Sequence, residues 1–232
     1  MTAIPAHTFW QTLYPPKAFS NDPNTVFADA YPADLPDGRQ ILLPIRVLPG
    51  DGTRAVASLI VNQASFEVED ALTEVMATNS RPLEPEIVIG VPTLGLPLAN
   101  GVARRLGHSR MVALGTSRKF WYDEALSEPL KSITTPGGGK DIYLDPRMLP
   151  LLEGKRILLV DDVVSSGASL AAVLRLLDKA GLSPVGICVA MEQGNRWKKA
   201  LSPDAAGKVR GAFRSPILRH ENDGWVVDSD LI

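Results

Sequence analysis

The residues with the clearest chemical potential lie in the stretch RILLVDDVVSSGASL, residues 156–170. In this stretch an apolar run ends in two adjacent carboxylates, Asp161 and Asp162, and three serines and one glycine follow within seven positions. The apolar run predicts a buried strand over 157–160, and the periodicity after the serines predicts a helix over 167–181. The acids and the hydroxyls therefore belong to a turn that joins a strand to a helix.

This turn has the composition of a cradle for one phosphate group. The start of a helix presents unpaired N–H groups and a partial positive charge, the serine hydroxyls add donors, and Gly167 allows close approach of the backbone. The pattern that holds nucleoside triphosphates, G-x-x-x-x-G-K-[ST], is absent, because Ala168 stands where its lysine would be. No G-x-G-x-x-G follows a predicted strand, so a dinucleotide site has no support.

The two carboxylates need a partner other than the phosphate, because like charges repel. Sugar hydroxyls and divalent cations are groups that carboxylates bind. Successive strand residues point to opposite faces, so we expect Asp161 and Asp162 to have separate tasks, one at a diol and the other at a cation or a nearby base. The stretch therefore predicts an activated sugar phosphate as ligand. The simpler alternative is a capped helix, for which two acids and three serines are more than a cap requires.

The elements around this stretch predict an α/β fold with a parallel sheet. Short apolar segments such as EIVIGV, RMVAL and SPVGICVAM alternate with helical patterns, and ligands of such folds bind at the carboxyl ends of the strands. Earlier in the chain, PGDG between RQILLPIRVL and TRAVASLIVN predicts a β-hairpin. Ser65 is the predicted cap of a helix whose apolar positions begin at Phe66. We expect residues 1–38 to form an irregular arm and the last residues to add short strands or a cap.

Composition limits the class of protein. The chain has 232 residues, 45% of them hydrophobic, and a formal net charge of −2, which argues against a broad nucleic-acid surface. The one cysteine, Cys188, lies in an apolar run and excludes an internal disulfide. The first residues lack the pattern of a secretory signal, and no apolar run is long enough to span a membrane. We therefore expect a cytoplasmic protein without a nucleic-acid or membrane partner.

The stretch ILLVDDVVSSGAS resembles, position by position, the phosphoribosyl-pyrophosphate (PRPP) binding signature of type I phosphoribosyltransferases. The resemblance extends over residues 85–200. It implies an α/β parallel-sheet fold with a small hood built from an N-terminal hairpin and C-terminal segments. We divide the chain accordingly into an N-terminal arm and hairpin (1–64), a phosphoribosyltransferase core (65–200), and C-terminal strands or a cap (201–232).

The resemblance also implies roles for the residues of the signature. Asp161 and Asp162 would contact the ribose hydroxyls and hold Mg²⁺ that arrives with PRPP. The loop after the acids would hold the 5′-phosphate. Its residues are Ser165, Ser166, Gly167, Ala168 and Ser169.

Two further segments resemble the pyrophosphate side of the family's site. One stands in place of the pyrophosphate loop, although purine members often carry a basic residue there and an ordinary strand-to-helix turn is the alternative. Its candidate residues are Pro92, Thr93 and Leu94. In the other, Arg118 and Lys119 resemble the basic pair of adenine and xanthine phosphoribosyltransferases, which would stabilise the charge of departing pyrophosphate. A solvated basic pair is the alternative reading.

The lid and the base site are implied by two more segments. KSITTPGGGK, residues 131–140, stands where the family has a mobile lid, which would keep water from an oxocarbenium-like transition state. Its candidate lid residues are Thr134, Thr135 and Lys140. VAMEQGNRWKKAL resembles the strand and glycine–arginine segment of purine members, with the start of a surface helix as the alternative. The candidates to face the base are Val163, Glu192, Asn195 and Arg196.

The resemblance leaves the catalytic acid or base unassigned. Adenine-specific members usually carry a glutamate in the lid, where this chain has glycine, and hypoxanthine-guanine members carry an aspartate where it has Ser165. We expect a homodimeric enzyme that transfers phosphoribosyl from Mg-PRPP to a nucleobase, a purine by its adenine- and xanthine-like features, and releases pyrophosphate. Two alternatives stay open: a non-catalytic regulator that senses PRPP, favoured by the missing acids, and an orotate or other pyrimidine enzyme with a different hood.

Overall fold

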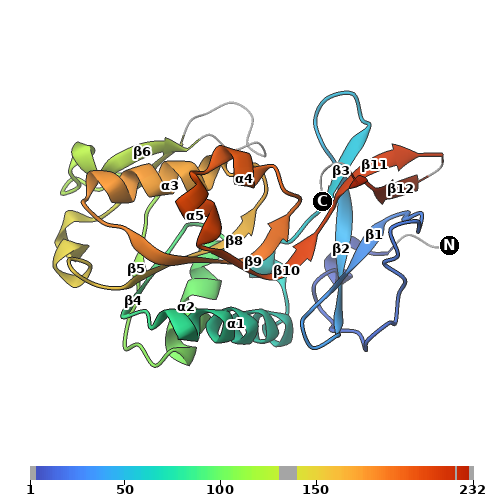
Figure 1. The fold of residues 1–232 in the computed structure, drawn as a ribbon, viewed down its shortest axis with the longest axis horizontal. Helices are drawn as coiled ribbons and strands as arrows, with labels where there is room; N and C mark the ends of the chain where they lie inside the picture. The colour runs from blue at the N-terminus through green and yellow to red at the C-terminus, as the bar shows by residue number, and fades with distance from the viewer. Residues whose placement is uncertain (1–3, 131–139, 223, 230–232) are drawn as a thin grey trace.

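The computed structural model describes residues 4–130, 140–222 and 224–229 and has an α/β architecture (Figure 1). Its central sheet has the strand order β10-β9-β8-β4-β5, and every neighbouring pair is parallel. These strands are β4 (Ile87–Gly90), β5 (Val112–Ala113), β8 (Ile157–Val164), β9 (Pro184–Gln193) and β10 (Val209–Ser215). The parallel sheet that the sequence predicts is confirmed.

Helices cover both faces of the central sheet, because its strands are apolar on both faces. Val88 and Leu158 belong to the hydrophobic cluster on the side of α1 and α2, whereas Ile89 and Leu159 belong to the cluster on the side of α3 (Figure 1). The α-helices are α1 (Phe66–Ser80), α2 (Gly95–Arg105), α3 (Ala168–Lys179), α4 (Trp197–Ala200) and α5 (Pro203–Gly207). Short 3-10 helices are η1 (Ala6–Thr8), η2 (Val61–Gln63), η3 (Arg81–Leu83), η4 (Glu124–Leu126) and η5 (Pro146–Leu151).

A second sheet forms the hood beside the core (Figure 1). Its strand order is β1-β2-β3-β11-β12, and the neighbouring pairs are antiparallel. The strands are β1 (Ala30–Asp34), β2 (Gln40–Val47), β3 (Arg54–Ala57), β11 (Ile217–Glu221) and β12 (Gly224–Val227). The pair β2–β3 is the predicted hairpin, and β11 and β12 come from the other end of the chain, so the hood is built as predicted. The exact division of the chain at residues 64 and 200 stays a prediction.

The N-terminal arm is more ordered than its composition suggests. It contributes β1, and the side chains of Phe9, Trp10 and Phe27 are buried in the hydrophobic cluster on the hood side. Trp10 also donates its indole N–H to the carbonyl of Ser58 at 2.9 Å. The prediction of an irregular arm over 1–38 is therefore wrong at β1 and at these anchors. Prolines and aspartates hide the strand pattern, whereas burial of large aromatic rings supplies the stabilisation.

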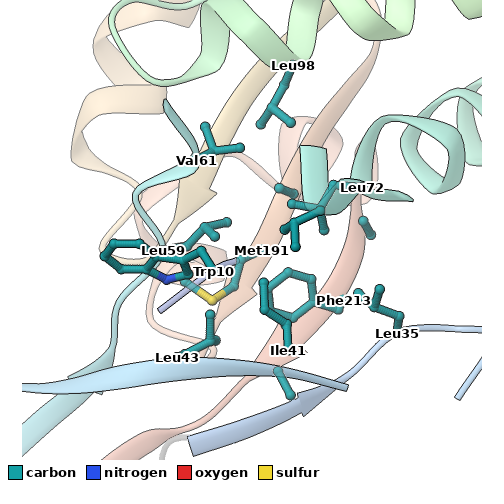
Figure 2. Close-up of a cluster of buried hydrophobic side chains, with 14 of the residues drawn as sticks. Trp10, Leu35, Ile41, Leu43, Leu59, Val61, Leu72, Leu98, Met191 and Phe213 are labelled. Atoms are coloured by element: carbon teal, nitrogen blue, oxygen red, sulfur yellow. The ribbon is translucent and has the colours of Figure 1, made fainter. Parts of the chain in front are cut away.

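One hydrophobic cluster joins the hood to the core (Figure 2). Ile41 and Leu43 of β2 lie in the same cluster as Leu72 of α1 and Met191 and Phe213 of the central sheet. Most of these side chains have almost no contact with solvent. The hood and the core are therefore packed as one body, and the position of the hood over the carboxyl end of β9 is set by side-chain packing.

The strand that carries the acids is longer than predicted. It continues through Asp161 and Asp162 to Val164, where it is still paired with β9 at Glu192. The turn is correspondingly shorter, and the helix begins at Ala168. Pairing with the long neighbouring strand holds both acids in extended backbone, which the polar composition of this segment does not reveal.

Three smaller features complete the fold. Ser65 caps α1 as predicted, since its Oγ accepts a hydrogen bond from the Val68 N–H at 3.3 Å, but Phe66 faces solvent instead of the core. The strands β6 (Ser127–Leu130) and β7 (Lys140–Tyr143) pair with each other on either side of residues 131–139. No helix in the described part of the chain is long and apolar enough to cross a bilayer. The cytoplasmic location stays a prediction.

Removing part of the shared cluster should unfold the hood and the core together. Leu43→Ala leaves a cavity at a fully buried position, so we expect the free energy of unfolding to fall by about 2–5 kcal/mol. Denaturant unfolding followed by near-UV and far-UV circular dichroism should show one shifted transition. Val47→Ala, on the same strand at a position that is 55% exposed, is the control and should change stability by about 0.5 kcal/mol or less. Two separate transitions in Leu43→Ala would contradict a shared core.

Candidate functional site

Four loops meet at the carboxyl edge of the central sheet. They follow β5, β4, β8 and β9, which are successive neighbours in the sheet (Figure 1). The ends of β4 and β5 lie opposite each other, at Gly90 and Ala113, and Gly90 also lies opposite Val160, directly before the acid pair. The strands β8 and β9 continue further together, with Val164 opposite Glu192. The segments singled out in the sequence thus lie side by side at one edge, where the ligands of parallel sheets bind.

The acid pair lies against the start of α2. The N–H of Val91 donates to the carbonyl of Val160 at 2.9 Å, which holds the chain after β4 against the end of β8. A Cβ added to Gly95, the first residue of α2, would lie 2.8 Å from the Cα of Asp161 and 2.9 Å from its Oδ1. The N–H of Asp162 donates to that same Oδ1 at 2.9 Å. Glycine is therefore required at position 95 by close packing, a role that the sequence analysis missed because the contact joins distant segments.

Burial raises the pKa of both carboxyl groups. Asp161 is 8% exposed, and burial together with the neighbouring charge of Asp162 raises the pKa of Asp161 well above its usual value. Burial also raises the pKa of Asp162. Hydroxyl donors or a cation would favour the ionised form of either group, so the pair is suited to a ligand that brings them.

Gly167 shapes the loop between β8 and α3. Its φ of 81° lies in the left-handed region, and an added Cβ would lie 2.9 Å from Ala200 Cβ and 3.2 Å from Trp197 Cα. The turn therefore needs glycine for both its conformation and its space. The start of the 12-residue helix α3 presents N–H groups to this loop, and the N–H of Ala168 donates to Ser166 Oγ at 3.3 Å. The hydroxyl-bearing residues that stay partly exposed in this loop are Ser165, Ser166 and Ser169.

The turn between β4 and α2 carries no charged side chain. The peptide bond between Pro92 and Thr93 is cis. Thr93 is exposed, and Pro92 and Leu94 are half-buried. Contacts with an anion at this turn would therefore come from backbone N–H groups and the Thr93 hydroxyl.

The basic pair lies in the exposed segment after β5. Arg118 pairs with Glu124 at 2.6 Å, and the two side chains are 53% and 74% exposed. A surface pair of this kind contributes about 0–1 kcal/mol, so an anion could replace Glu124 at small cost. Lys119 is also exposed and available to solvent.

A cluster of aromatic and charged side chains anchors this segment. Trp121 donates its indole N–H to Asp145 Oδ2 at 3.4 Å, and the guanidinium of Arg147 lies 4.5 Å from the centre of the Trp121 ring. The hydrogen-bonded Arg147, 2.6 Å from Asp145, lowers the pKa of Asp145 to about 2. Gly115 and Tyr143 exchange two backbone hydrogen bonds of 3.0 and 2.8 Å. Asp145 is not predictable from the sequence, because its contact with Trp121 is not part of any periodic pattern.

The candidates for base contact have different surroundings. Val163 is half-buried and packs against the shared hydrophobic cluster. The carboxylate of Glu192 accepts a hydrogen bond from the N–H of Gly211 at 2.7 Å and pairs with Arg214 at 3.3 Å, so it is turned toward β10. Asn195 is half-buried in the turn after β9.

The end of β9 also connects the core to the hood. The buried amide of Gln193 donates to the carbonyl of Ala57 in β3 at 2.7 Å. Arg196 is half-buried, and its Nε is enclosed without a hydrogen-bond partner among the described residues. Gln193 was missed in the sequence because its partner is a backbone group of the hood.

The structure describes only the two strands, β6 and β7, that flank the candidate lid. Lys140 is exposed at the first position of β7. The buried Glu128 of the paired strand β6 forms an ion pair of 3.2 Å with Arg175 of α3. This ion pair holds the two flanking strands against the core. Thr134 and Thr135 lie outside the described residues.

Comparison with known proteins identifies the family. The sequence model of the phosphoribosyl transferase domain matches residues 60–212. The chain belongs to the phosphoribosyltransferase family. This match covers the central sheet as far as the middle of β10, together with its helices, so all four loops of the site fall within it.

Individual relatives support the same assignment. This phosphoribosyltransferase is 30% identical over 133 residues to the chloroplastic amidophosphoribosyltransferase 2 of Arabidopsis thaliana, covering 57% of this chain and 23% of that protein. It is 35% identical over 109 residues to the adenine phosphoribosyltransferase of Rhodococcus opacus, covering 46% and 57% of the two chains. The adenine phosphoribosyltransferase from Rhodothermus marinus has the same fold, with a TM-score of 0.55, 22% identity and coverage of 74% and 94%. The predicted resemblance to the purine branch of type I phosphoribosyltransferases and the predicted fold class are confirmed. The chain spans less than two thirds of the length of both curated relatives.

Removing the charge at position 161 should make the unliganded phosphoribosyltransferase more stable. Because the native pKa of Asp161 is raised, the unfolded chain loses this proton first, and native stability falls as the pH rises from the usual carboxyl range through the raised pKa. Asp161→Asn removes that loss, so the variant should be more stable than the wild type at about pH 7.5. The difference in stability should be smaller at about pH 4, where the folded wild type keeps its proton on Asp161. Each kcal/mol gained raises Tm by about 2–4 °C for a chain of this size.

Urea unfolding at both pH values in magnesium-free buffer measures this effect. Asp178→Asn, which alters an exposed acid on α3, is the control and should change stability by about 0.5 kcal/mol or less. An Asp161→Asn protein that is less stable than the wild type at neutral pH would show that burial does not penalise this carboxylate.

A methyl group at position 95 should disturb the acid pair. Gly95→Ala places a Cβ inside contact distance of Asp161, so we expect a loss of about 1–3 kcal/mol and weaker binding of PRPP. Thermal unfolding and calorimetric titration with PRPP measure the two effects. Gly207→Ala is the control, because an added Cβ there meets nothing within 4 Å. If folded Gly95→Ala bound PRPP with unchanged affinity, Asp161 would not contribute to binding of this ligand.

Proposed function

We propose that this protein transfers the 5-phosphoribosyl group of PRPP to a nucleobase and releases pyrophosphate. The observation that carries the proposal is the end of β8, where two largely buried carboxylates precede a serine-lined loop at the start of α3. The loop suits a terminal phosphate, and the acids suit ribose hydroxyls. Membership of the phosphoribosyltransferase family supports this assignment.

Magnesium fits the acid pair as an ion that arrives with the substrate. Mg²⁺ binds one or two carboxylates together with substrate phosphates. Asp161 and Asp162 provide two carboxylates, and the described residues contain no cluster of three His, Cys, Asp or Glu side chains that would hold a metal alone. The remaining ligands would be oxygens of PRPP and water. Such an ion would neutralise charge that develops on the leaving pyrophosphate.

In this transfer, the protein would mainly position the reactants and stabilise the charge of the leaving pyrophosphate. A ring nitrogen of the base forms a bond to C1 of the ribose, the C1–O bond to pyrophosphate breaks with its electrons on the leaving group, and the proton of the nitrogen is released. The phosphate loop and the acid pair hold the two ends of the ribose phosphate, which supplies orientation. Arg118 and Lys119 would stabilise the departing anion, helped by the backbone N–H groups of Thr93 and Leu94. A lid role for Lys140 stays a prediction.

A purine is the base that we propose. Adenine phosphoribosyltransferases occur among the sequence relatives and among the structures with this fold. Val163 would supply an apolar contact next to the acids, and Asn195 and Arg196 would supply polar contacts after β9. Glu192 is engaged with Gly211, so we assign it to holding β9 against β10.

Turnover with a panel of bases tests the proposal. The protein is mixed with PRPP, magnesium and, in turn, adenine, hypoxanthine, guanine, xanthine, uracil and orotate, and the nucleotide product is followed by chromatography. Asp162→Asn should lower kcat/KM for the accepted base by about 10²–10³-fold, because it removes a group placed at the reacting ribose. Asp178→Asn is the matched control and should leave turnover unchanged.

The result also decides between the proposal and its alternatives. PRPP binding in calorimetry without turnover of any base would favour a PRPP-sensing regulator. Turnover of orotate or uracil alone would favour a pyrimidine enzyme, and absence of PRPP binding would overturn the site itself. The homodimer is part of the proposal, and sedimentation equilibrium of the full chain tests it.

A further inference from the structure

A polar cavity of about 480 Å³ lies between the hood and the end of β9. Cavities that bind small molecules commonly have volumes of about 300–1,000 Å³. The core side of this cavity is Arg196, and its hood side is the turn of the β2–β3 hairpin. The hood residues that line it are Leu48, Pro49, Gly50, Asp51, Thr53 and Arg54.

Arg196 is the residue of the core that lines this cavity. Its Nε is buried and has no hydrogen-bond partner among the residues that the structure describes. A buried donor without a partner costs about 1–3 kcal/mol, and more when it is charged. The position of Arg196 is fixed, because the next residue, Trp197, packs against Gly167 of the phosphate loop. Because the Nε is enclosed, a ligand in the cavity would meet Arg196 through the rest of its side chain, which lines the cavity.

The other charged groups around the cavity leave it rich in donors. Arg54 is 55% exposed, and its Nε lies 3.8 Å from Asp228 Oδ2, which is a weak ion pair. The carboxylate of Asp51 serves its own turn, since it accepts hydrogen bonds from the Thr53 N–H at 2.9 Å and from Thr53 Oγ1 at 2.7 Å. Two guanidinium groups, one from the hood and one from the core, are therefore the main groups that a ligand would meet.

The stereochemistry of the proposed transfer brings the base to this side. In a direct displacement at C1, the new bond forms on the face opposite the bond that breaks. The candidate pyrophosphate segments follow β4 and β5 on one side of β8, whereas Arg196 follows β9 on the other side. A base that approaches C1 opposite the pyrophosphate therefore comes over the end of β9, toward Arg196 and the hairpin.

We infer that the base presents an oxo or carboxylate group to Arg196, so that 6-oxopurines are accepted in preference to adenine. This inference rests on the proposed phosphoribosyl transfer. A guanidinium has donors only, and the O6 and N7 atoms of a 6-oxopurine offer it two acceptors. Adenine offers an acceptor at N7 but a donor at N6, which the guanidinium cannot bond. The base preference thus differs from that of the adenine relatives that share the fold.

Exchange of Arg196 for glutamine tests the inference directly. The amide of glutamine bonds both N6 and N7 of adenine, so Arg196→Gln should lower the ratio of kcat/KM for hypoxanthine to kcat/KM for adenine by about 10–100-fold. Arg196→Lys keeps the charge but loses the two-donor fork, and it should lower the same ratio by a smaller factor. Arg54→Gln should lower it as well, because it removes the hood donor. Arg46→Gln, which alters an exposed arginine of β2 outside the cavity, should leave the ratio unchanged.

Calorimetry with PRPP alone separates this inference from the proposed function. If the wild type fails to bind PRPP, the proposed transfer fails. If the wild type binds PRPP and uses adenine as well as or better than hypoxanthine, only the inference fails. Turnover of orotate alone would overturn the purine assignment and, with it, the preference for 6-oxopurines. If PRPP binds but no base reacts, the ratio of hypoxanthine to adenine affinity for the PRPP complex is measured in the same four variants, with the same expected order.

Discussion

Close approach of α2 to the end of β8 is the constraint on which the candidate site depends. Gly95 leaves no room for a side chain between the helix and Asp161, and the backbone bond from Val91 to Val160 extends the β4–β8 pairing to this point. The end of β4 is thereby held beside Val160, so the turn that follows β4 lies next to the acid pair. A wider gap here would separate the acid pair from the turn after β4 while the rest of the sheet stayed intact.

This packing makes the acid pair costly in the unliganded protein, and apolar burial elsewhere offsets the cost. Asp161 is buried and Asp162 is largely buried, which raises the pKa of each carboxyl group. The central sheet buries apolar side chains on both faces, and the hood adds its own side chains to one of the two clusters. A ligand that brings hydroxyl groups or a cation would restore favourable contacts to the carboxylates. Its binding would therefore stabilise the native state at the same two residues whose burial costs free energy.

Local patterns predicted most of the central sheet and the strand–turn–helix unit around the acids, because residues close in sequence determine those elements. Gly167 was found for this reason, since its neighbours Ser166 and Ala168 already indicate a helix start. Contacts between distant segments were not predictable. Position 95, for example, requires glycine because it packs against Asp161, which is 66 residues away in the sequence. The same limit explains the misjudged arm, where Phe27 exchanges backbone hydrogen bonds with Trp225 from the other end of the chain. It also explains the longer β8, which its pairing with β9 extends beyond its apolar residues.

Under the proposed function, the core holds the ribose phosphate and the hood contributes to the site of the base. This separation explains how proteins with one fold can use different bases. The acid pair, the phosphate loop and the turn after β4 all lie on the central sheet, whose geometry is fixed by parallel pairing and helix packing. The hairpin turn at 48–54 is held within the hood, by the register of β2 with β3 and by the backbone hydrogen bond from His220 to the carbonyl of Thr53, and β3 is tied to the core by the Gln193 amide at Ala57. Its tip carries Gly50 and Gly52, where an added Cβ would meet nothing within 4 Å, although the φ values of 134° and 76° favour glycine. A change at this tip would therefore not touch the core. Arg196 is fixed beside the loop after β8 and Arg54 belongs to the hood, so under the proposed function the group that reads the base is assembled from both, and likeness in the core alone does not determine the base.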